Sequence, residues 1–125
     1  PKIAPDLRVG NGVKPQFVSH DPAVVAAYKA DPLVHDRISA RLARFIADSG
    51  PLTLALASQW KVPTLLLYAG DDRLLNADGS RTFAKLAPKD VVTTQCFDAL
   101  YHEIFNELDA KPVFAALKQW LDKRF

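Results

Sequence analysis

Two adjacent carboxylates and one histidine are the side chains of this sequence best suited to act together in a reaction. Asp71 and Asp72 come shortly after the apolar run Val62–Tyr68, and His102 comes shortly after the β-rich run Val91–Phe97. A carboxylate that accepts the Nδ1–H of a histidine fixes the tautomer of the imidazole and stabilises its charged form. The histidine can then take a proton from a nucleophile. These residue types in this order therefore indicate nucleophilic catalysis assisted by a carboxylate–histidine pair.

The order of these segments, a strand before an acid and then a strand before a histidine, is the order in which α/β-hydrolases end. Such enzymes carry their nucleophile earlier, in a sharp G-x-S-x-G turn, and the 125 residues contain no such motif. None of the serines lies in a turn of this kind: they are Ser19, Ser39, Ser49, Ser58 and Ser80. Cys96 lies inside a predicted strand, so we interpret it as a small buried apolar residue rather than as an alternative nucleophile. The sequence thus predicts half of a catalytic triad.

Each of these residues also has a plain structural interpretation. Gly-Asp-Asp is ordinary turn composition, and one of the two carboxylates can simply cap a helix. A single histidine in a loop is often a surface or capping residue. Function is favoured because both loops follow the carboxyl ends of neighbouring predicted parallel strands, where α/β proteins place their sites. From placement alone, either Asp71 or Asp72 can be the partner of His102.

Composition narrows the class of protein. A chain of 125 residues with 49% hydrophobic and 24% charged residues is typical of one globular domain. The net charge of +2 and the absence of Lys/Arg runs argue against a nucleic-acid partner. One cysteine cannot form an internal disulfide, and no apolar run approaches the roughly 20 residues of a transmembrane segment. We therefore expect a cytoplasmic protein without a transmembrane segment.

Two further histidines are weak candidates for a metal site. His20 and His35 have no Cys, Asp or Glu around them at metal-ligand spacing. We interpret both as surface residues or local hydrogen bonders. The sequence therefore predicts no metal ion and no cofactor.

The first half of the chain predicts helices and no strands. Proline and glycine interrupt residues 1–20 too often for a long element, and Asp21-Pro22 is typical of a helix start, here followed by a helix over 23–29. A second helix is predicted from an Asp36 cap to Ser49, where Gly50-Pro51 ends it, and a short apolar helix covers 52–58. We expect residues 1–58 to form a helical cap or lid.

Three arginines recur on one face of the second predicted helix. They are Arg37, Arg41 and Arg44. A stripe of this kind is most often a solvated helix face. Its functional interpretation is contact with anionic head groups, which would place the protein peripherally at a membrane surface.

The second half alternates strands and helices. The strands Val62–Tyr68 and Val91–Phe97 alternate with helices over 78–86 and 109–123, which makes a βαβα unit and requires a parallel sheet. The first strand is apolar throughout and expects a neighbour on each side, yet only one is available. We expect residues 59–125 to be the C-terminal part of a hydrolase core. Its free strand edge requires a partner, either a missing N-terminal part of the protein or a second copy.

Several segments are similar to the closing part of the monoacylglycerol lipase and lysophospholipase group of α/β-hydrolases. They are Val62–Leu75, Ala77–Ser80 and Tyr101–Glu107, and Ala30–His35 resembles the D-P-L segment of that group's helical cap. In this group the acid precedes a basic residue. The resemblance therefore implies that Asp72, which precedes Arg73, is the triad acid and that Asp71 lies outside the triad. It implies that His102 is the triad base.

The resemblance implies an α/β fold, with a helical cap followed by the last two strands and helices of an α/β-hydrolase parallel sheet. It implies a serine that attacks the acyl carbonyl of a monoacylglycerol or lysophospholipid, with His102 as base and then as acid. The serine and the oxyanion-hole segment of the family belong to an N-terminal part, so the chain alone is expected to be inactive.

Two alternatives stay open. The chain can be a non-catalytic fragment that serves as an interaction module. It can also come from another α/β-hydrolase, such as an epoxide or haloalkane hydrolase, in which an aspartate is the nucleophile. The Asp-Pro-Leu segment at 31–33 favours the lipase group.

Overall fold

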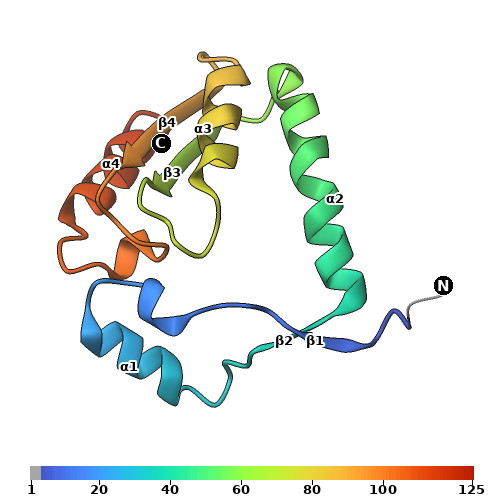
Figure 1. Cartoon of the computed structure of the whole chain (residues 1–125). Coiled ribbons are helices and arrows are strands. Elements are labelled where there is room, and N and C mark those ends of the chain that lie inside the picture. Colours follow the sequence, from blue (N-terminus) through green and yellow to red (C-terminus); the bar gives the residue numbers. More distant parts are fainter. Residues whose placement is uncertain (1–3) are drawn as a thin grey trace.

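The structure is a computed structural model that describes residues 4–125. Short strands and helices alternate along the chain (Figure 1). The first half holds β1 (Arg8–Gly10), the 3-10 turn η1 (Pro15–Phe17), α1 (Pro22–Ala30), β2 (Arg37–Ser39), α2 (Ala40–Leu56) and η2 (Ala57–Gln59). The second half holds β3 (Thr64–Ala69), α3 (Ala77–Leu86), β4 (Val92–Phe97), η3 (Ile104–Asn106) and α4 (Lys111–Asp122).

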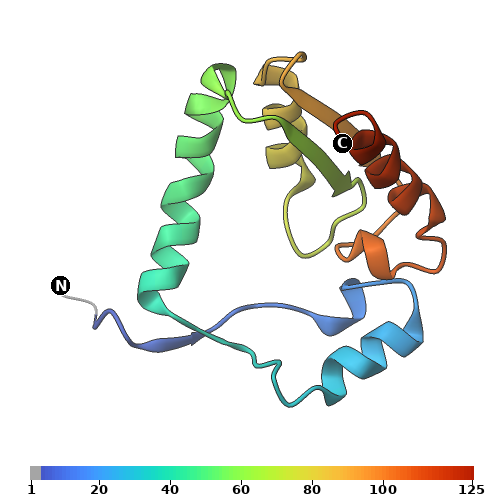
Figure 2. The same ribbon diagram turned by 180° about the vertical axis from the view of Figure 1, so that it is seen from behind.

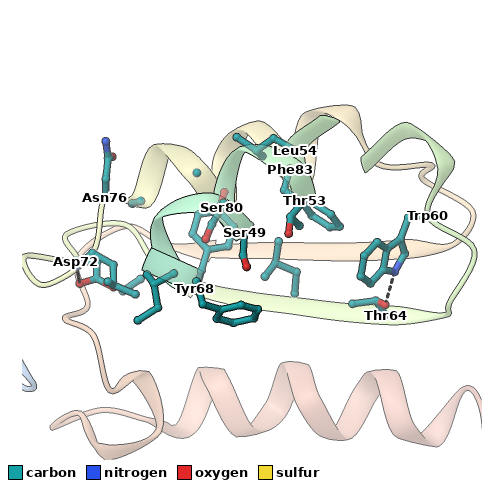
Figure 3. Close-up of a pocket in the computed structure, with 18 residues that line it drawn as sticks. Ser49, Thr53, Leu54, Trp60, Thr64, Tyr68, Asp72, Asn76, Ser80 and Phe83 are labelled. Atoms are coloured by element: carbon teal, nitrogen blue, oxygen red, sulfur yellow. Dashed lines mark hydrogen bonds between the residues drawn. The ribbon is translucent and has the colours of Figure 1, made fainter. Parts of the chain in front are cut away.

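The second half forms the predicted βαβα unit. β3 and β4 pair in parallel, with Thr64 opposite Val92 and Ala69 opposite Phe97. The two helices cover opposite faces of this two-stranded sheet, α3 on one side and α4 on the other (Figures 1 and 3). Within the described residues β3 pairs with β4 alone, so its second edge is free. The side chains of β3 are accordingly half-buried rather than buried, except for Ala69.

The small core lies on the α4 side of the sheet, near the carboxyl ends of the strands. Ala69, Ile104 and Val113 are buried there, with Leu67 and Phe97 packed against them. Burial of these apolar side chains fixes the loop between β4 and α4 to the sheet. The loop that carries His102 is therefore held at both of its ends.

The first half contains two strands, so the prediction of a half without strands is wrong. β1 and β2 pair antiparallel, with Arg8 opposite Ser39 and Gly10 opposite Arg37. Each strand has only three residues, which is too short for a local alternation of polar and apolar residues to reveal it. The pairing joins segments far apart in the sequence. Part of residues 1–20 is thus extended and paired, and residues 1–3 of that range lie outside the described residues.

The second helix begins and ends later than predicted. Ser39, not Asp36, caps α2, since its hydroxyl accepts the Leu42 N–H at 3.1 Å. The helix then continues through Pro51 to Leu56 instead of ending at Gly50. Proline removes one intrahelical hydrogen bond, yet the helix continues through Pro51, and the residues after it, 52–56, are mostly good helix formers.

The predicted arginine stripe is wrong in one member, and each of the three arginines has an acidic neighbour. Arg37 lies in β2 rather than on the helix. The ion pairs are Arg37–Asp36, Arg41–Asp6 and Arg44–Asp48, and all six side chains are largely exposed. Pairs of this kind contribute little stability. They also leave less positive charge free for a lipid head group.

The helices of the second half start close to the predicted positions. α3 begins at Ala77, one residue before the predicted start, and is capped by Asn76, whose side chain accepts the Asp78 N–H at 2.9 Å. α1 is capped by Asp21 and ends before Asp31, as predicted.

No helix among residues 4–125 is long and apolar enough to cross a membrane.

The helix α2 stands away from the sheet, joined to it by η2 at one end (Figures 1 and 2). At its other end the short β1–β2 ribbon and α1 lead back to the loop before α4 (Figure 2). Large apolar side chains of α2 are exposed: Phe45 is 64%, Ile46 57% and Leu52 60% exposed. These side chains have too few neighbours within the described chain to be buried.

Candidate functional site

Asp72 and His102 meet at the carboxyl ends of β3 and β4. The Asp72 Oδ2 lies 2.8 Å from the His102 Nδ1. The other carboxylate oxygen, Oδ1, accepts the backbone N–H groups of Leu74 and Leu75, each at 2.9 Å. These bonds fix the rotamer of Asp72, whose side chain is 12% exposed, whereas that of His102 is 36% exposed. The structure therefore brings together the two residues that the resemblance implied.

The hydrogen bond to Asp72 determines the tautomer of His102. An ionised carboxylate can only accept, so the Nδ1 of the ring must carry the proton. The opposite nitrogen, Nε2, is then unprotonated in the neutral ring and can act as a base. This arrangement can extract a proton from a hydroxyl group placed against Nε2.

The adjacent carboxylate has a different partner. Asp71 forms a two-pronged ion pair with Arg73, at 3.2 Å to Nε and 3.0 Å to Nη2. The Arg73 guanidinium in turn lies over the Tyr101 ring, 4.9 Å from its centroid, and near Phe17 at 5.5 Å. Arg73, which follows Asp72, therefore contacts the residue directly before His102. This contact joins the two loops.

Gly70 follows β3 directly and packs against the backbone at the end of β4. Its N–H donates to the Phe97 carbonyl at 2.8 Å. A Cβ at this position would lie 2.5 Å from the Asp98 Cα and 2.9 Å from the Asp98 carbonyl oxygen. Only glycine fits such an approach between backbones. The distance between the loops that carry Asp72 and His102 is set here.

A second carboxylate–histidine pair lies behind the His102 loop, and the sequence analysis missed it. Glu107 Oε1 lies 2.9 Å from the His20 Nδ1 and accepts the Tyr101 N–H at 2.6 Å. Its Oε2 accepts the His20 N–H at 3.1 Å and lies 3.5 Å from the Ser19 Oγ. The one available signal was the glutamate that closes the Tyr101–Glu107 segment.

The carboxylates of Asp72 and Glu107 both have a pKa below the usual value. Burial of Asp72 raises its pKa, but the hydrogen bonds from His102, Leu75 and Leu74 together lower it more. Burial likewise raises the pKa of Glu107, and the N–H of Tyr101 and the two donors of His20 outweigh it. Both groups are therefore ionised near neutral pH. The negative charge on Asp72 is what a protonated His102 ring needs beside it.

These two pKa shifts predict the acid sensitivity of the fold. A carboxylate whose pKa is lower in the folded state adds stability above its unfolded pKa and loses it as the pH falls through the folded value. With ordinary values of 3.8 for Asp72 and 4.5 for Glu107, the free energy of unfolding should decrease as the pH falls from about 5 towards 3. Urea titrations of the complete polypeptide encoded by the reading frame that contains this chain measure it. Asp72→Asn and Glu107→Gln should each make this pH dependence shallower, and an unchanged slope in both would contradict the assignment.

A groove of about 640 Å³ runs between α2, β3 and α3 (Figure 3). Its walls are mainly apolar and include Phe45, Ile46, Leu54, Leu66, Tyr68 and Phe83. Asp72 lies at one end of the groove, and Trp60, which donates to the Thr64 Oγ1 at 2.9 Å, lies at the other (Figure 3). His102 is not among the lining residues. The groove follows β3 and the exposed face of α2 rather than the carboxylate–histidine pair.

The remaining sequence candidates lie away from the Asp72–His102 pair. Cys96 is inside β4 and half-buried rather than buried, with its Sγ 3.3 Å from the Asp98 Oδ1; burial raises the pKa of its thiol. Ser80 lies on α3 and lines the groove. His35 is exposed, and its ring accepts the Arg37 N–H at 3.3 Å. Among residues 4–125, no cluster of three His, Cys, Asp or Glu side chains is placed to hold a metal ion.

The sequence of this chain matches a family model and named relatives. The sequence model of one family, Hydrolase_4, described as serine aminopeptidase, S33, matches residues 1–109. The chain is 36% identical over 121 residues to a monoacylglycerol lipase from Mycolicibacterium smegmatis, covering 96% of this chain and 43% of the lipase. It is 29% identical over 123 residues to phospholipase YtpA from Bacillus subtilis, covering 97% of this chain and 47% of that protein.

A solved structure agrees in fold along nearly the whole chain. The crystal structure of Paleococcus ferrophilus monoacylglycerol lipase superposes with a TM-score of 0.91 at 33% identity, covering 98% of this chain and 48% of that one. The chain thus spans less than half the length of each of these three proteins.

Proposed function

Because the chain belongs to the Hydrolase_4 family, described as serine aminopeptidase, S33, we propose that it carries the acid and the base of a serine ester hydrolase. The two parallel strands with their helices, and the helical segments before them, are part of an α/β-hydrolase fold, as the sequence predicted. The proposed substrate is a lipid-like ester, a monoacylglycerol or a lysophospholipid. Two relatives carry the names monoacylglycerol lipase and phospholipase, which supports this substrate class.

The observation that carries the proposal is the bond between Asp72 and His102. In the proposed reaction, the His102 Nε2 takes the hydroxyl proton of a serine as the serine oxygen attacks the acyl carbonyl. The protonated ring, stabilised by Asp72 2.8 Å from Nδ1, then gives the proton to the leaving alcohol oxygen. Water hydrolyses the acyl-serine by the same two steps. The side chain of His102 is 36% exposed, which leaves room for a nucleophile at its outer nitrogen.

The nucleophile is proposed to come from polypeptide that precedes this chain. We propose that residues 1–58 form the cap and residues 59–125 the C-terminal part of the core. The free edge of β3 and the groove beside it then receive the preceding part of the core, with a strand paired to Thr64–Ala69. The apolar face of α2, exposed at Phe45 and Ile46, supports this occupant. The groove is then the binding site of this preceding part of the core and not the channel for the acyl chain of the substrate.

Three measurements test the proposal. The reading frame upstream of Pro1 should encode an apolar run followed by G-x-S-x-G, and its absence would overturn the proposal. The complete polypeptide should hydrolyse p-nitrophenyl butyrate and a monoacylglycerol, whereas the isolated 125 residues should not. Turnover by the isolated chain would show that another residue is the nucleophile. A stable dimer of the isolated chain in sedimentation would instead assign the free edge to a second copy.

A further inference from the structure

Glu107 is the most completely buried carboxylate in the described chain that the proposed reaction does not use. Its side chain is 1% exposed. Both of its oxygens are occupied by donors from two segments far apart in the sequence: Tyr101 from the His102 loop, and His20 from the segment before α1. A buried charge is expensive unless such donors surround it. The Glu107 carboxylate therefore joins these two segments.

One of the donors to Glu107 is the backbone N–H of Tyr101, the residue directly before the proposed base His102. The bond from the Tyr101 N–H is short, at 2.6 Å, and Tyr101 is bonded through its peptide to His102. The ring of Tyr101 is stacked on that of His20, with centroids 3.5 Å apart and planes 24° apart. The Arg73 guanidinium also lies over this ring, 4.9 Å from its centroid. Backbone and side chain of Tyr101 are thus both fixed.

The segment before α1 is itself immobilised against this loop. Val18 and Ser19 are 1% and 2% exposed. The Glu103 N–H donates to the Val18 carbonyl at 2.8 Å, and the Ser19 hydroxyl lies 2.9 Å from the Asn106 carbonyl oxygen. Glu107 is the charged centre of this contact. A change at Glu107 would therefore be transmitted to the backbone on the N-terminal side of His102.

We propose that Glu107 is a positioning residue for His102, which sets the place of the imidazole beside Asp72 by holding the Tyr101 backbone against the segment 18–20. The proposal rests on the proposed function, because it assigns Glu107 a role in the same reaction. Glu107 does not reach the reacting atoms. It acts through the geometry of the Asp72–His102 pair.

Glu107→Gln is the main test, because glutamine keeps the shape and removes the charge. Every side of the Glu107 carboxylate faces a donor, so the new NH₂ group must point at one of them. We expect kcat of the complete polypeptide to fall about 10- to 100-fold with KM nearly unchanged, since a displacement of about 1 Å can cost 10²-fold. The matched control is Glu103→Gln in the same loop, where the amide oxygen can still accept from Asn106 Nδ2. Its kcat should stay within about twofold of wild type.

A double variant separates positioning from mere stability. If Glu107 acts through the Asp72–His102 pair, Glu107→Gln should cost far less kcat in an Asp72→Asn background than in the wild type. A purely structural role would lower the melting temperature and leave kcat per folded molecule unchanged, which would overturn the proposal. The folded fraction is measured by circular dichroism in each sample.

A pair of variants at His20 decides the question if Glu107→Gln does not fold. His20→Asn keeps a side-chain donor near the Glu107 oxygen, and His20→Leu removes it. A kcat at least about threefold lower in His20→Leu than in His20→Asn supports the proposal, and equal values overturn it.

The proposed esterase function and the positioning role of Glu107 are contradicted by different results. A complete polypeptide without esterase activity, or one that keeps its activity in His102→Ala, contradicts the proposed function. An enzyme that is inactivated by His102→Ala but whose kcat is indifferent to Glu107→Gln contradicts only the positioning role.

Discussion

His102→Ala in the complete polypeptide is expected to lower kcat for ester hydrolysis by about 10⁴- to 10⁶-fold, with KM and the fold nearly unchanged. The reason is the position of the ring between Asp72 and the site proposed for the nucleophile. Without the imidazole the serine hydroxyl keeps its proton, and the leaving alcohol has no acid. The side chain of His102 is partly exposed, so its removal leaves no large cavity. Single-turnover and steady-state kinetics with p-nitrophenyl butyrate measure the loss.

Variants at neighbouring positions make this result specific. Asp72→Asn should cost about 10⁴-fold in kcat, because the amide can stabilise the wrong tautomer of His102 and carries no charge for the protonated ring. Asp71→Asn should cost at most about tenfold, since Asp71 pairs with Arg73 and not with His102. His35→Ala removes an exposed histidine far along the chain and serves as the control. A His102→Ala enzyme as active as His35→Ala would exclude His102 as the base.

The part of the fold that could be predicted from sequence is the part with strong local signals. The run around Thr64–Ala69 is apolar throughout, and Val92–Phe97 is rich in β-formers, so both strands could be placed within two residues. A right-handed crossover then requires a parallel pair with both carboxyl ends at one edge. Asp72 and His102 follow these ends, so their proximity could also be expected. Local pattern and topology were sufficient for this geometry.

The features that were missed depend on contacts between distant segments. The three-residue strands β1 and β2 have no periodic pattern to detect, and only their pairing makes them strands. His20 and Glu107 are separated by 87 positions, so no spacing rule relates them. Tertiary contact outweighed local preference in each case.

Gly70→Ala is expected to destabilise the complete polypeptide by about 2–4 kcal/mol and to lower kcat by about 100-fold. The added methyl group would meet the Cα and carbonyl of Asp98, at 2.5 and 2.9 Å, and backbone atoms cannot rotate away as the end of a side chain can. The two strand ends must separate. Asp72 follows one of them and His102 the other, so the separation acts directly on their hydrogen bond. The midpoint and slope of urea unfolding and kcat of the folded enzyme are the measurements.

Gly10→Ala is the matched control for this prediction. Gly10 lies in β1 with no atom within 4 Å of an added Cβ, and Gly12 is the one glycine of the described residues with positive φ. Alanine at position 10 should therefore change stability by less than about 1 kcal/mol and leave kcat unaltered. If Gly70→Ala were as stable and as active as Gly10→Ala, the strand ends would not approach as closely as the structure places them. A normal stability with a low kcat would instead mean that the loops yield to the methyl group without unfolding, and that the relative position of Asp72 and His102 is the more sensitive quantity.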